Sequence, residues 1–72
     1  MTTGEMAAWT RRLRNILDGP ADVRRERLDI MLRDLRATYG VTMVLGNTTM
    51  TVMRGWFAAR LAETVREWRE VV

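Results

Sequence analysis

The sequence feature that most constrains the fold is an uncharged segment in the middle of the chain, residues 41–53, which reads VTMVLGNTTMTVM. Charged residues make up 29% of the whole chain, so a long segment without any of them stands apart from its surroundings. Two runs rich in methionine and β-branched residues flank the dipeptide Gly46-Asn47. Glycine at the first position of a two-residue loop favours a type II′ turn. The segment therefore predicts a β-hairpin.

The predicted pairing divides the side chains of the hairpin between two different faces. A two-residue loop opposes Met43 to Met50, and side chains alternate along each strand. One face is mainly apolar and carries Val41, Met43, Leu45, Thr48, Met50 and Val52. The other face is richer in threonine and carries Thr42, Val44, Thr49 and Thr51. Because an isolated two-stranded hairpin is marginal in water, we expect its apolar face to pack on helices.

Helical spacing on both sides of this segment predicts three amphipathic helices. The first covers residues 3–18 and begins with the capping box Thr2-Thr3-Gly4-Glu5. The second covers residues 20–39 and ends at Gly40, as a left-handed cap. The third covers residues 55–71 after the break at Arg54-Gly55, and its apolar stripe comprises Phe57, Leu61, Val65, Trp68 and Val72. The fold class is therefore α+β, a small single domain over residues 1–72 in the order helix, helix, β-hairpin, helix.

Size and composition favour a chain that associates with copies of itself. A chain of 72 residues is near the lower limit for a self-sufficient core, and it has no cysteine for disulfides. The free strands of the hairpin can pair with another copy, and Val23 and Ile30 lie opposite the main apolar stripe of the second helix. We therefore expect a homodimer or a larger assembly, with contacts from Met43, Val44, Met50, Val23 and Ile30.

The amino-acid content argues against an enzyme. Histidine, cysteine, serine and lysine are all absent, which excludes the common nucleophiles and the imidazole base. The carboxylate pairs one helical turn apart have arginines within four residues, so a solvated charge ladder explains them. We expect no catalytic residue, no metal ligand set and no cofactor. The chain has no run of 18 apolar residues, so we expect no membrane association and a cytoplasmic location.

All twelve basic residues are arginine, and the formal net charge is +3. Six arginines flank the corner at Gly19-Pro20 and could form one basic patch: Arg11, Arg12, Arg14, Arg24, Arg25 and Arg27. Such a patch would contact an acidic protein partner or a nucleic acid. Neighbouring carboxylates at Asp18, Asp22 and Glu26 support the alternative, a partly neutralised solvated face. The sequence leaves the partner and its pathway open.

A second interpretation replaces the hairpin with helices. Residues 45–54 resemble the turn and recognition helix of helix-turn-helix regulators, and the matching residues are Leu45, Gly46, Thr48, Thr51, Val52 and Arg54. The resemblance implies an all-α bundle and a DNA-binding transcriptional regulator that uses residues 46–54. In that fold the major groove would be faced by Thr48, Thr49, Met53 and Arg54, with Arg54 as the strong base reader.

Overall fold

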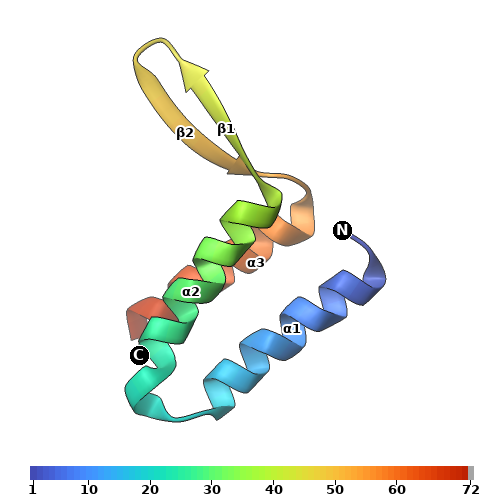
Figure 1. Cartoon of the computed structure of the whole chain (residues 1–72), viewed down its shortest axis with the longest axis vertical. Coiled ribbons are helices and arrows are strands. Elements are labelled where there is room, and N and C mark those ends of the chain that lie inside the picture. The colour runs from blue at the N-terminus through green and yellow to red at the C-terminus, as the bar shows by residue number, and fades with distance from the viewer. Residues whose placement is uncertain (72) are drawn as a thin grey trace.

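The computed structural model describes residues 1–71 and has the predicted order of elements. Three helices, α1 (Thr3–Asp18), α2 (Ala21–Tyr39) and α3 (Trp56–Val71), accompany two strands, β1 (Gly40–Leu45) and β2 (Thr48–Met53). Figure 1 shows the helices grouped together and the hairpin standing beyond the end of α2. The α+β fold is confirmed, and the all-α alternative is wrong because residues 48–53 form a strand. Val72, part of the predicted apolar stripe, lies outside the described residues.

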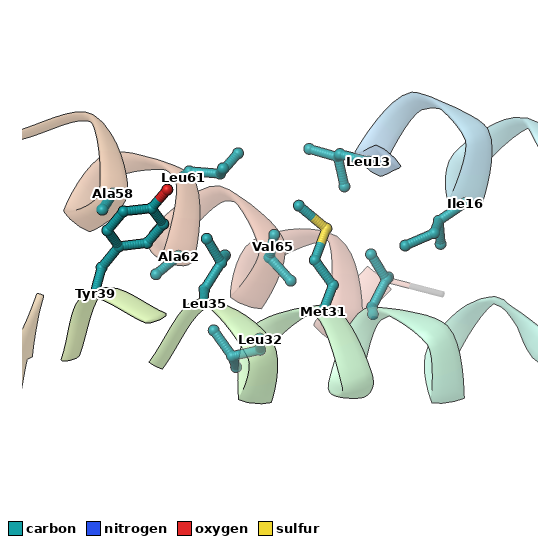
Figure 2. Close-up of a cluster of buried hydrophobic side chains, with 11 residues drawn as sticks. Leu13, Ile16, Met31, Leu32, Leu35, Tyr39, Ala58, Leu61, Ala62 and Val65 are labelled. Atoms are coloured by element: carbon teal, nitrogen blue, oxygen red, sulfur yellow. The ribbon is translucent and has the colours of Figure 1, made fainter. Parts of the chain in front are cut away.

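Helix α2 is the centre of the core, because α1 and α3 both pack against it. Its apolar stripe meets side chains from both neighbours, as Figure 2 shows. The buried residues are Leu13 and Ile16 from α1, Leu28, Met31, Leu32, Leu35 and Tyr39 from α2, and Ala58, Leu61, Ala62 and Val65 from α3. Full burial of one large aliphatic side chain contributes about 1.5–3 kcal/mol. This helical core therefore supplies the stability of the fold.

Polar contacts fasten the N-terminal half of α1 to the C-terminal half of α2. The predicted capping box is present, with the Glu5 amide donating to Thr2 Oγ1 at 3.1 Å. Tyr39 Oη donates to Glu5 Oε2 at 2.5 Å and accepts from Trp9 Nε1 at 3.1 Å. The hydrogen bond from Tyr39 lowers the pKa of Glu5, and the same bond raises the pKa of Tyr39. One buried tyrosine thus joins the helix cap to the core.

The hairpin has the register that its sequence predicts. Met43 opposes Met50, Val41 opposes Val52 and Leu45 opposes Thr48 in an antiparallel pair. Gly46 has a φ of +62°, and no residue other than glycine has a positive φ within residues 1–71. A positive φ at the first loop position alone is the signature of the type II′ turn. The strand pairing and the turn are both confirmed.

The junction between α2 and β1 differs from the prediction. Gly40 has a φ of −74° and a ψ of 139°, so it is extended and not the left-handed cap that we expected. Its backbone leads directly from the helix into the strand. A Cβ atom at this position would collide with the backbone oxygen of Arg36 and meet Thr51 Cγ2 at 3.0 Å. Glycine is needed here because of a close approach and not because of a left-handed backbone.

Candidate self-association surface

The hairpin leaves an uncharged apolar surface in contact with solvent. The expectation that its apolar face packs on the helices is wrong, since every residue from position 41 to 52 is exposed. The large apolar side chains among them are Val41, Met43, Val44, Leu45, Met50 and Val52, with exposed fractions from 41% to 69%. In the part of the chain that the structure describes, the sheet has two strands, so each strand also has one edge free for backbone pairing. Contiguous apolar surface with free strand edges is typical of an interaction site.

The direction of the apolar face follows from the base of the hairpin. Met53 is half-buried and packs against the helical core. Side chains alternate along a strand, so Val52 and Met50 lie on the opposite face from Met53. Met43 and Val41 share that face because they pair with Met50 and Val52. At its base the hairpin therefore turns its threonine-rich face toward the core and its apolar face away. The core cannot cover the apolar face in this arrangement.

The structure divides the five residues predicted for self-association among three places. Met43 and Met50 are direct cross-strand partners, whereas Val44 lies on the other face of the hairpin. Val23 and Ile30 are half-buried on α2. From Val23 to the start of the hairpin α2 extends roughly 25 Å, at about 1.5 Å per residue. The two methionines thus belong to the exposed apolar face, and Val23 lies far along α2 from the hairpin.

Three further hairpin residues belong to this surface and Trp56 is exposed near it, although none was among the predicted contact residues. Val41, Val52 and Leu45 extend the face of Met43 and Met50, as the alternation of side chains already indicated. Trp56, the first residue of α3, is 79% exposed beside the hairpin base. Gly55 has a φ of +85°, and this change of chain direction has no signature that predicts where Trp56 points.

The six arginines proposed as one basic patch do not act as one surface. Arg12 Nη2 pairs with Asp34 Oδ2 at 2.7 Å, and its guanidinium lies 5.4 Å from the centre of the Trp9 ring. Arg24 Nη2 donates to the backbone oxygen of Gly19 at 3.1 Å, at the C-terminal end of α1. Both side chains therefore join α1 to α2. Cations at helix C-termini are favourable because the carbonyl groups there carry partial negative charge.

The other four arginines of the predicted patch are exposed. Arg11 and Arg27 line a shallow hollow of about 290 Å³ between α1 and α2. Arg14 lies with Arg11 along a separate groove between α1 and the start of α3. Arg25 lines neither hollow. The corner at Gly19-Pro20 thus spreads the positive charge over several faces, which favours the solvated interpretation for most of it.

The residues that the helix-turn-helix interpretation assigns to DNA reading are placed differently. Thr48 and Thr49 lie on β2, and Met53 packs toward the core. Arg54 Nη2 donates to Thr38 O at 2.7 Å, and Arg54 Nε donates to Tyr39 O at 3.4 Å. The guanidinium therefore binds the end of α2. The helix-turn-helix interpretation is wrong for this segment, because residues 48–53 pair with β1 as a strand. The ten-residue sequence match could not detect this pairing.

Comparison with known proteins adds no relative: no protein-family model, curated protein or solved structure matches this chain. Within residues 1–71 no helix is both long and apolar enough to cross a membrane. In the same part of the chain, acidic side chains do not gather in a group of three that could hold a metal ion.

Proposed function

We propose that this chain is a non-enzymatic binding module that associates with copies of itself through the apolar face of its hairpin. The observation that carries the proposal is the direction of that face, which points away from the helical core while Met43 and Met50 stay exposed. A monomer gains nothing from such a surface, since apolar area in water is unfavourable. Contact with a second copy removes it from water.

The chemistry of the hairpin favours a second copy over a charged partner. Residues 41–53 carry no charge, so this surface offers nothing that would select a charged ligand. An uncharged apolar face can pack on an apolar surface of a second copy, and a two-fold interface then repeats the same contact from each copy. The exposed arginines of α2, Arg25 and Arg27, then stay free to contact an acidic macromolecule. A cytoplasmic location, favoured by the cysteine-free composition, remains a prediction.

Sedimentation velocity over a range of protein concentrations tests the proposal. The wild-type chain should show a mass that rises with concentration, and Met43→Asp or Met50→Asp should sediment as a monomer. Both methionines lie outside the core, so far-UV circular dichroism should show the same helix content in these variants. Burial of an unpaired carboxylate in an apolar contact costs several kcal/mol, which is enough to abolish a modest dimer.

Thr49→Asp is the matched control, because it places the same charge on the same hairpin but on the opposite face. This variant should keep most of the association. A wild-type chain that stays monomeric at every concentration contradicts the proposal. Equal assembly by Met43→Asp and the wild type would contradict it as well.

A further inference from the structure

The hairpin face alone is too small to hold two copies together. Six residues at about 3.4 Å each, and a width of about 10 Å, give it roughly 200 Å². Two such faces in contact bury about 400 Å², whereas stable interfaces bury about 1,200–2,000 Å² in total. A stable assembly therefore needs a second surface on each copy.

A groove near the hairpin base offers such a surface. It lies between α1 and the start of α3 and has a volume of about 470 Å³. Met6, Ala7 and Phe57 supply its apolar part, and both Met6 and Phe57 are half-buried. Arg11 and Arg14 line it as well, and neither forms an ion pair within residues 1–71. Among residues 1–71, no carboxylate lines the groove.

The groove and the hairpin complement each other in polarity. Methionine side chains are unbranched and adaptable, so Met43 and Met50 can fill an irregular apolar floor. The free strand edges present backbone carbonyl groups that need donors. Arg11 and Arg14 carry several N–H donors each and no acceptor, so they match those edges. An uncharged hairpin also avoids repulsion with the two arginines.

We infer that each hairpin lies in the groove between α1 and α3 of a second copy, and that two copies exchange hairpins about a two-fold axis. This inference rests on the proposed self-association and specifies its geometry. The hairpin base and the N-terminal ends of α1 and α3 lie at the same end of the molecule, as Figure 1 shows. One axis can therefore satisfy both contacts. Exchange forms this hairpin-to-groove contact twice, so it buries about twice the area of one such contact.

Cysteine cross-linking between two single-cysteine variants tests the inference, because the natural chain has no cysteine. Ala7→Cys marks the groove, and Met43→Cys or Met50→Cys marks the hairpin. The two are mixed, with a tag on one of them, and oxidised mildly. A disulfide requires Cα atoms within about 7 Å, so it reports direct neighbours. We expect the mixed dimer in clear excess over either homodimer. Ala21→Cys, at the exposed first residue of α2 and a full helix length from the hairpin, replaces Ala7→Cys as the control and should give no mixed dimer.

A second variant tests the groove without cross-linking. Ala7 is exposed, so Ala7→Glu leaves the core intact while it places a carboxylate beneath the docked hairpin. We expect the dimer dissociation constant to rise at least tenfold, with no change for Ala21→Glu at the exposed start of α2.

The outcomes separate the two proposals. Abundant Met43→Cys homodimers without a mixed dimer, together with unaffected assembly by Ala7→Glu, would show hairpins packed face to face. That result overturns the exchange and leaves the proposed self-association standing. Monomers throughout overturn both.

Discussion

Arg54 provides the sharpest test of how the hairpin is attached to the helices. Its guanidinium donates to the backbone oxygen of Thr38 at 2.7 Å and more weakly to that of Tyr39 at 3.4 Å. Its backbone amide also donates to Tyr39 O, at 2.7 Å. Arg54→Ala removes both side-chain bonds and keeps the amide bond. The variant therefore isolates the contribution of the guanidinium to the free energy of unfolding.

The magnitude follows from the geometry of these bonds. A hydrogen bond that involves a charged group contributes about 1.5–3 kcal/mol, and a cation at a helix C-terminus adds about 0.3–1 kcal/mol. Only the bond to Thr38 has a good length, and it is solvent-exposed, so the lower part of that range applies. We expect Arg54→Ala to lower the free energy of unfolding by about 1–2 kcal/mol. For a chain of this size, that corresponds to a melting temperature lower by about 4–16 °C.

Urea unfolding followed by circular dichroism measures the effect, at several protein concentrations because self-association also stabilises the folded state. Arg60→Ala is the control, since Arg60 is exposed and only reaches Glu63 Oε2 at 3.5 Å. An exposed pair of this kind contributes about 0–1 kcal/mol. Equal urea midpoints for Arg54→Ala and Arg60→Ala would show that the hydrogen bonds of the Arg54 guanidinium do not stabilise the fold.

Two further predictions concern the core and the polar contact between α1 and α2. Leu35 is fully buried, so Leu35→Ala should cost about 2–5 kcal/mol, a large share of the roughly 4–11 kcal/mol expected for a chain of this size. Met43→Ala should leave the monomer almost unchanged, and similar urea midpoints for these two variants would contradict the assignment of the core. Tyr39→Phe removes the donor that lowers the pKa of Glu5. A carboxyl group whose pKa is lower in the folded chain than in the unfolded chain stabilises the fold at pH values above its unfolded pKa. This stabilisation is lost as the pH falls through its folded pKa. The loss in free energy of unfolding caused by Tyr39→Phe, measured in urea, should therefore be largest near neutral pH and smaller in acid. A loss that does not change with pH would contradict this coupling.

Features that depend on a few neighbouring residues could be predicted from the sequence. The capping box joins Thr2 to Glu5, and the turn at Gly46 sets the pairing of Met43 with Met50. Turn geometry and side-chain alternation determine such contacts within short stretches of chain. The apolar stripe of α2 was equally clear, because helical periodicity alone defines it. The order of elements followed from these local signals.

The tertiary structure decided where the hairpin points and which arginines remain free. Gly40 is extended because the helix continues straight into the strand, so the hairpin projects beyond the core instead of folding onto it. Arg54 meets Thr38 across sixteen positions of the chain, and Arg12 meets Asp34 across twenty-two. Contacts between distant residues depend on how the helices pack, and periodicity carries no information about them. The sequence by itself thus determined that residues 41–53 form an uncharged hairpin. The packing of the helices decided that the apolar face of this hairpin is exposed to solvent.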